Sequence, residues 1–191
     1  MGTKPGPPIG VRTVSDALVG KHNRGDRWGM SEALHTYLHD HLAGATFALN
    51  LLETLTESHR GESLGTFASG LRSEVEADRA LLQDLAERVG SDPSAVKNAA
   101  GWLSEKVAGF KLRQHSGSPL GTFESLETLA LGIMGKRALW DALAIAAVRD
   151  PRLGNMNFEQ LALSATDQHR RVEEQRLRAA ADALCPAPAG T

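Results

Sequence analysis

Cysteine is almost absent from this chain of 191 residues, and long apolar runs are missing. The single cysteine, Cys185, cannot form an internal disulfide, so we expect a reducing, cytoplasmic environment. No stretch approaches the roughly 20 consecutive apolar residues that a bilayer-spanning helix requires. The Gly- and Pro-rich first residues lack the apolar segment of a signal peptide. The sequence therefore predicts a cytoplasmic protein without a membrane span.

A strong net charge is also missing. The formal charge is −2 and the isoelectric point about 6.4, so the chain has no global basic character for nucleic acid or an anionic membrane. Arg170, Arg171, Arg176 and Arg178 form one local basic cluster, but Glu173 and Glu174 are interleaved with it. This pattern is typical of an ion-paired, solvated helix surface.

Several catalytic motifs are absent as well. The chain has no Walker loop, dinucleotide fingerprint, Cys-x-x-Cys or His-Glu-x-x-His. None of its serines and histidines occupies a recognisable nucleophile turn. We therefore predict no catalytic residue, and the sequence leaves open whether the protein is an enzyme.

Composition predicts one globular domain of ordinary character. Apolar residues make up 41% and charged residues 23%, which suits a substantial buried core at this length. We expect residues 1–30 to be a flexible arm, residues 31–184 to fold, and residues 185–191 to be a disordered tail.

Apolar residues repeat at three- and four-residue steps in four segments, which predicts an all-α fold. The first helix is expected from a cap at Ser31 to about Ser58, and the second from Leu64 to a stop at Gly90. The third is expected at about 122–148, before Asp150-Pro151, and the fourth at about 157–184. The second link is too long for a hairpin. We expect it to cross the bundle lengthwise, to carry a short extra helix around Trp102, and to leave the second and third helices parallel.

Two antiparallel helix pairs joined by one long crossover resemble the ferritin-like four-helix bundles. Residues 37–55, YLHDHLAGATFALNLLETL, are similar to the opening helix of small bacterial ferritin-like proteins of unassigned role. Di-iron members of that class place a Glu on each of two helices and a Glu-x-x-His on each of the other two. The resemblance implies a polar layer in the core where a metal is held.

This chain matches the di-iron pattern in part. Glu74 and Asp78 lie one turn apart in the apolar stripe of the second helix, and Glu74 matches the motif's Glu. His169 matches its His on the fourth helix, and His41 stands on the first helix where a Glu is expected. The remaining motif positions depart from the pattern: Ala77 replaces a His, Thr166 replaces a Glu, and Lys136 and Arg137 occupy the middle of the third helix.

Two interpretations of this layer stay open. In one, Arg137 or Lys136 neutralises Glu74 and Asp78, and His41 and His169 complete a hydrogen-bonded network. In the other, His41, Glu74, Asp78 and His169 ligate iron, manganese or zinc. The mid-helix glycines also have two explanations, which are close helix approach and a pocket for a small ligand; they are Gly44, Gly132 and Gly135.

We expect a non-catalytic or degenerate ferritin-like protein that acts through interaction or assembly. The alternative is an iron- or manganese-binding protein with a redox or iron-handling role. We also expect a homodimer, because Tyr37, Phe47 and Leu51 lie off the inner stripe of the first helix. No nucleic-acid partner is expected.

Overall fold

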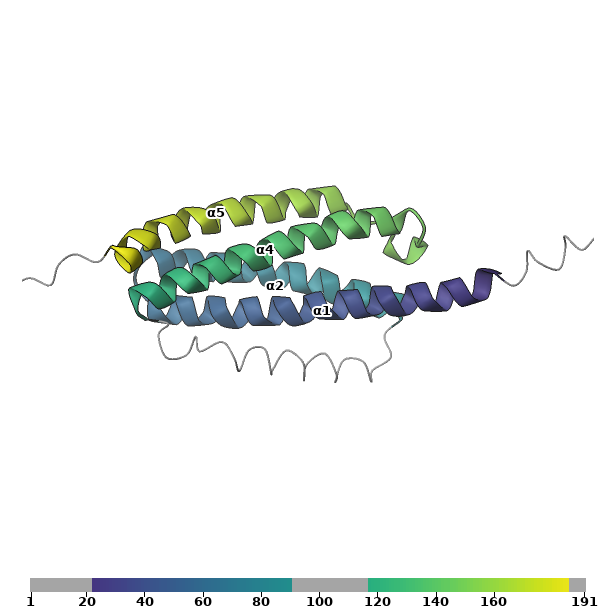
Figure 1. Cartoon of the computed structure of the whole chain (residues 1–191), viewed down its shortest axis with the longest axis horizontal. Coiled ribbons are helices and arrows are strands. Elements are labelled where there is room, and N and C mark those ends of the chain that lie inside the picture. Colours follow the sequence, from purple (N-terminus) through teal and green to yellow (C-terminus); the bar gives the residue numbers. More distant parts are fainter. Residues whose placement is uncertain (1–21, 91–116, 186–191) are drawn as a thin grey trace, which may run out of the picture.

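A computed structural model describes residues 22–90 and 117–185, and almost all of these residues are helical. In chain order the elements are α1 (His22–Ser58), α2 (Ser63–Val89), α4 (Pro119–Ala147), the short 3-10 helix η2 (Pro151–Leu153) and α5 (Phe158–Leu184). Figure 1 shows the four long helices side by side. The predicted all-α bundle is confirmed. The extra helix expected around Trp102, most of the arm and most of the tail lie outside the described residues.

The predicted start of the first helix is wrong. α1 begins at His22, so Ser31 lies inside the helix and does not cap it. Serine is a good cap, but it is also tolerated within a helix, so its presence alone does not fix the first residue. The N-terminal part of α1 projects beyond the other helices, as Figure 1 shows.

The other helix ends have the expected local causes. Gly90 ends α2 in the left-handed conformation at φ 90°, and its N–H donates to Glu87 O. Ser118 accepts from Gly121 N and starts α4 with Pro119 in its first turn, slightly before the predicted residue 122. Asn157 caps α5 through the Gln160 N–H.

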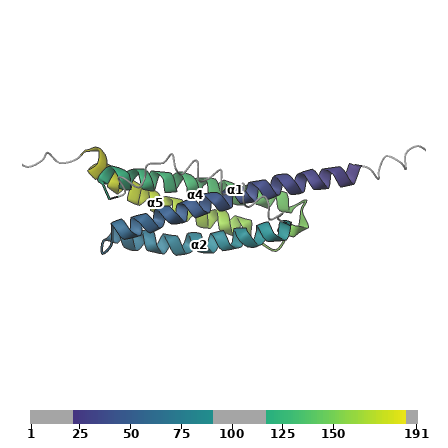
Figure 2. The same cartoon turned by 90° about the horizontal axis from the view of Figure 1, so that it is seen from below.

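The helix directions confirm the predicted crossover. His59, at the α1–α2 turn, lies 2.9 Å from Thr122 Oγ1 at the start of α4. At the opposite end, Arg152 of η2 donates to Val89 O, the last residue of α2, at 2.8 Å. α2 and α4 therefore begin at the same end and run parallel, whereas neighbours in an up-down-up-down bundle would be antiparallel. This is the connectivity of ferritin-like bundles, and Figures 1 and 2 show the pairs α1 with α2 and α4 with α5.

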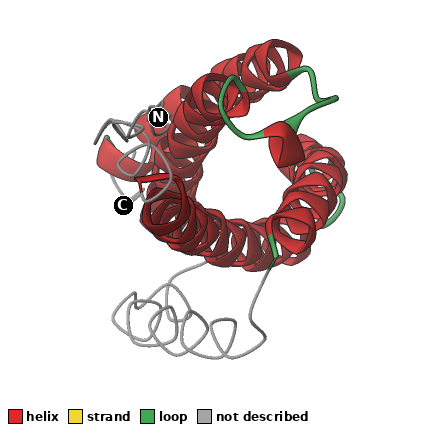
Figure 3. Ribbon diagram, turned by 90° about the vertical axis from the view of Figure 1, so that its right-hand side faces the viewer, coloured by secondary structure: helices red, strands yellow, loops and turns green. Residues whose placement is uncertain are grey.

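Apolar side chains from all four helices fill the interior. Figure 3 shows the helix ribbons arranged around this interior in a view along the bundle. Its largest fully buried members include Trp140 and Leu residues such as Leu38, Leu71 and Leu126. On α2 the middle of the buried stripe passes over Val75, whereas the sequence places Glu74 and Asp78 within it. Val75 and Leu82 are buried, while Glu74 and Asp78 lie at the margin of the core and Leu81 is exposed.

α4 differs from the other helices because it is apolar on its outer side too. Leu131, Met134 and Ile145 are 70%, 43% and 76% exposed. None of the described helices combines the length and the apolar character that crossing a bilayer requires.

Candidate functional site

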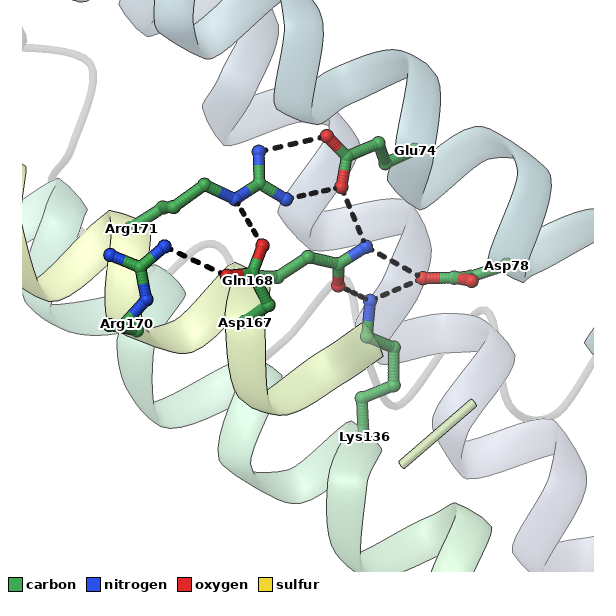
Figure 4. Close-up of polar contacts among 7 residues, drawn as sticks. All are labelled: Glu74, Asp78, Lys136, Asp167, Gln168, Arg170 and Arg171. Atoms are coloured by element: carbon green, nitrogen blue, oxygen red, sulfur yellow. Dashed lines mark hydrogen bonds and ion pairs between the residues drawn. The ribbon is translucent and has the colours of Figure 1, made fainter. Parts of the chain in front are cut away.

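A polar layer joins α2, α4 and α5 at the margin of the core (Figure 4). Its carboxylates are Glu74 and Asp78, one turn apart on α2. Lys136 reaches them from α4, and Gln168 and Arg171 reach them from α5. The layer thus joins the α1–α2 pair of helices to the α4–α5 pair.

Glu74 and Arg171 form its outer half. Arg171 donates to both oxygens of Glu74, at 2.9 and 2.6 Å, in the forked geometry that makes such pairs strong. The hydrogen bonds from Arg171, assisted by that from Gln168, hold the pKa of the Glu74 carboxyl below its usual range, against the opposing effect of partial burial. Arg171 also donates to Asp167 at 2.9 Å, and Arg170 contacts the same carboxylate at 2.8 Å.

Asp78 and Lys136 form the inner half. Lys136 Nζ lies 2.5 Å from Asp78 Oδ2, and both side chains are about 15% exposed or less. Gln168 is buried between the two halves. Its amide nitrogen donates to Glu74 at 3.1 Å and to Asp78 at 3.3 Å, while its amide oxygen accepts from Lys136. Each polar group of Gln168 is thereby satisfied in the core.

The structure decides between the two predicted cations of α4. Lys136 is the counter-charge of Asp78, and the prediction of Arg137 in that role is wrong. Arg137 points outward, is about half exposed, and lies 3.8 Å from Asp141 one turn later on the same helix. One residue along a helix turns the side chain by about 100°, which separates the core from solvent here.

The two predicted histidines are not joined to the carboxylates. His41 is half-buried, packs edge-on against Tyr37 at 4.7 Å between ring centres, and shares a pocket with Asp78 without a hydrogen bond to it. Burial lowers the pKa of His41. His169 is half-buried on α5 next to Gln168, and within the described residues no hydrogen bond connects it with Glu74 or Asp78.

These residues do not fit a metal ion in this arrangement. Glu74 uses both oxygens for Arg171, and Asp78 faces the Lys136 ammonium. Across residues 22–90 and 117–185, no three His, Cys, Asp or Glu side chains gather as a ligand group. The metal site at His41, Glu74, Asp78 and His169 remains a prediction for direct measurement.

His35 and His39 lie one turn apart on α1, and both are buried. Their ring centres are 4.2 Å apart, and they are 8% and 7% exposed. Burial and the neighbouring His35 lower the pKa of His39, which favours its neutral form.

A pocket of about 410 Å³ opens between α1, α2 and α4, and Lys136 and Asp78 are among the residues that line it. Gly44 and Gly132 lie in its wall. A Cβ added at either glycine, or at Gly135, would have no neighbouring part of the described chain within 4 Å. Close helix approach therefore does not explain these three glycines. The first two line a pocket, and the small ligand of the alternative explanation stays a prediction.

Gln168 and Arg171 belong to the layer but were not predicted as its members. The signal for Gln168 was its phase, since it lies three residues after Ala165 and four before Val172, which are both buried. The signal for Arg171 was its position one turn after Asp167 and next to Val172 at the border of that stripe.

The fold and the layer define a class: an all-α four-helix bundle in which a charge-paired network at the margin of the core links three of the helices. Comparisons of the chain with protein families, with curated proteins and with solved structures found no match.

Proposed function

We propose that the protein is a non-catalytic, ferritin-like bundle that acts by assembly, and that it forms a homodimer through the outer face of α4. The observation that carries the proposal is the apolar stripe on this face, which consists of Leu131, Met134, Ala138, Ala142 and Ile145, all exposed. A helix that is apolar on all sides normally has neighbours on all sides. Within the described structure, the outer side of α4 has none.

The charge-paired layer supports the non-catalytic part of the proposal. Arg171 occupies both oxygens of Glu74, the carboxylate that the di-iron pattern would give to a metal, and Lys136 occupies one oxygen of Asp78. Such a network holds the two helix pairs together, which is a structural role.

The stripe on α4 is complementary to itself. Leu131 and Ile145 lie equally far on either side of Ala138, and so do Met134 and Ala142. An antiparallel pair of α4 helices around a twofold axis at Ala138 would place Leu131 of one copy against Ile145 of the other. The small side chain at the axis permits close approach of the two helices.

Charges beside the stripe match the same arrangement. Arg137 and Asp141 flank the stripe, and both are about half exposed. In the antiparallel pair, Arg137 of one copy approaches Asp141 of the other, and the twofold axis repeats this contact. Charge complementarity of this kind selects a second copy of the chain over an unrelated partner.

The face of α1 expected from the sequence supports a dimer less well. Leu51 is 4% exposed and belongs to the core, and Phe47 is partly buried in the wall of the pocket. The apolar residues of α4 are more exposed and form a continuous stripe.

The test is the mass of the full chain in solution, measured by light scattering and sedimentation at micromolar concentrations. We expect a dimer for the wild type and a monomer for Ile145→Glu, since a carboxylate buried opposite Leu131 has no counter-charge. Leu163→Glu is the matched control, because Leu163 is 57% exposed on α5 and lies outside the stripe. It should remain dimeric.

A charge swap makes the test specific. Arg137→Asp alone should weaken the dimer, because it brings like charges together, and Arg137→Asp combined with Asp141→Arg should restore it. A monomeric wild type, or an Ile145→Glu variant as dimeric as the Leu163→Glu control, would overturn the proposal.

A further inference from the structure

We infer that the pocket between α1, α2 and α4 binds an aliphatic carboxylate of medium chain length. Leu131 borders both this pocket and the stripe proposed for the dimer, whereas Met134 and Ile145 do not line the pocket, so a substitution at Ile145 tests the assembly without altering the pocket wall. Its three supports are the volume of the pocket, its apolar walls and the charged side chains in its lining.

The pocket has the volume and lining of a small-molecule site. Its volume of about 410 Å³ lies within the usual range for such sites. Its walls are mainly aliphatic and aromatic and include Phe47, Leu51, Leu129, Ile133 and Trp140. An unbranched alkyl chain would gain contact with these side chains along the groove between α1 and α4.

Two glycines keep this groove open. Gly44 on α1 and Gly132 on α4 both line it, and each has free space where a side chain would begin. Glycine within a helix is about 1 kcal/mol less favourable than alanine, and neither position requires it for close packing. Space for an occupant explains both residues.

Charged side chains in the lining of the pocket favour an anion. Arg79 and Lys136 line it, and Asp78 is the carboxylate among its lining residues. Lys136 is already bound to Asp78 and Gln168. Arg79 donates to Thr46 Oγ1 at 3.3 Å, and no carboxylate of the described chain pairs with it.

A carboxylate head group would accept hydrogen bonds from the donors of Arg79 that have no partner in the described structure. The guanidinium presents several donors in one plane, of which Thr46 uses Nε. The remaining nitrogens match the two oxygens of a carboxylate. His41, the other titratable group of the lining, adds no negative charge, and the excess of cations around Asp78 disfavours a cationic head group.

The experiment compares three probes that share one alkyl chain: decanoate, decanol and decyltrimethylammonium. Binding to the full-length protein is measured by calorimetry below the concentration at which each probe forms micelles. We expect decanoate to bind at least about tenfold more tightly than the other two, which corresponds to one charge-assisted contact. Equal affinity for the ammonium probe would overturn the inference.

Two pairs of variants locate the site. Gly132→Leu should reduce decanoate affinity by about tenfold or more by filling the groove, whereas Gly70→Leu should not, because Gly70 also faces open space but lies outside the pocket. Arg79→Gln should reduce the affinity for decanoate but leave that for decanol unchanged, with Arg72→Gln on the same helix as its control.

Helicity measured by circular dichroism checks that each variant is folded. Ile145→Glu should bind decanoate like the wild type, so a failure of the dimer and a failure of the pocket are distinguishable. If Gly132→Leu binds decanoate as tightly as Gly70→Leu does, decanoate does not occupy this pocket and the inference is wrong.

Discussion

Arg171 of α5 donates to both carboxylate oxygens of Glu74 on α2, and so joins the α1–α2 pair of helices to the α4–α5 pair. Lys136 of α4 makes the second such connection through Asp78. Apolar contacts between helices are tolerant of sliding, whereas a forked ion pair has one favourable geometry. The two ion pairs therefore set the relative height of the two helical hairpins.

The Glu74–Arg171 pair predicts a specific acid sensitivity. The pKa of Glu74 is lowered in the folded protein from 4.5, so its contribution to stability is complete above that pH and is lost as the pH falls through the lower folded value. As the pH is lowered from 5 into the range where acid unfolds the protein, Glu74→Gln should therefore lose less stability than the wild type. Thermal unfolding across this range measures the difference.

The size of this effect at neutral pH is small. Glu74 is 39% exposed, so solvent screens the pair, and Glu74→Gln should cost about 1 kcal/mol or less at pH 7. Glu76→Gln on the same helix is the control, since Glu76 pairs with Arg72 outside the layer. The stability of Glu76→Gln should fall at low pH in the same way as that of the wild type. A Glu74→Gln curve of stability against pH that runs parallel to the wild-type curve would contradict the prediction.

Lys136 and Arg137 should respond very differently to the same substitution. Lys136→Met leaves the largely buried Asp78 without its cation and should destabilise the protein by about 3 kcal/mol. Arg137→Met removes a solvent-exposed pair with Asp141 and should change stability by about 0.5 kcal/mol or less. Urea denaturation of each variant gives the two free energies of unfolding.

A double substitution separates the charge from the packing. Lys136→Met combined with Asp78→Leu replaces the pair with apolar side chains and should recover most of the loss. Equal effects of Lys136→Met and Arg137→Met would show that the layer is not organised as described.

The sequence predicted the helices and their connectivity because these depend on periodicity and local stop signals. The apolar steps located α2, α4 and α5 closely, and Gly90 marked the end of α2. The length of the link after Gly90 required a crossover, which the parallel course of α2 and α4 confirms. The start predicted at Ser31 was wrong because serine is a common capping residue but also occurs within helices, and α1 begins before it.

The two carboxylates of the polar layer were predicted, but not all of the side chains that bind them. Glu74 and Asp78 stood out since they interrupt an apolar stripe. α4 has no polar side from which its orientation can be read, so Lys136 and Arg137 were equivalent in the sequence. Predicting that Gln168, and not its neighbour His169, belongs to the layer requires the helical phase of α5 and the relative height of the two hairpins. That relative height depends on tertiary packing alone.

Metal content decides between the charge-paired layer and the alternative metal site. We expect protein purified without a histidine tag to unfold at the same temperature with and without a chelator, because Arg171 and Lys136 already compensate the two carboxylates. Elemental analysis of the same sample gives the stoichiometry of iron, manganese and zinc. Stoichiometric metal that is lost in both Glu74→Ala and His169→Ala would establish the metal site.

Alanine substitutions at two glycines of α2 should have opposite signs. Gly65 lies in the first turn, where an added Cβ would meet the backbone oxygen of His59 at 2.1 Å, a distance that requires the α1–α2 turn to move. Gly70 is exposed in the same helix and has open space at that point. Gly70→Ala should stabilise the protein by up to about 1 kcal/mol through helix propensity, whereas Gly65→Ala should destabilise it despite the same gain. Urea denaturation under identical conditions measures both changes, and a stabilised Gly65→Ala variant would show that the turn at His59 is not held as described.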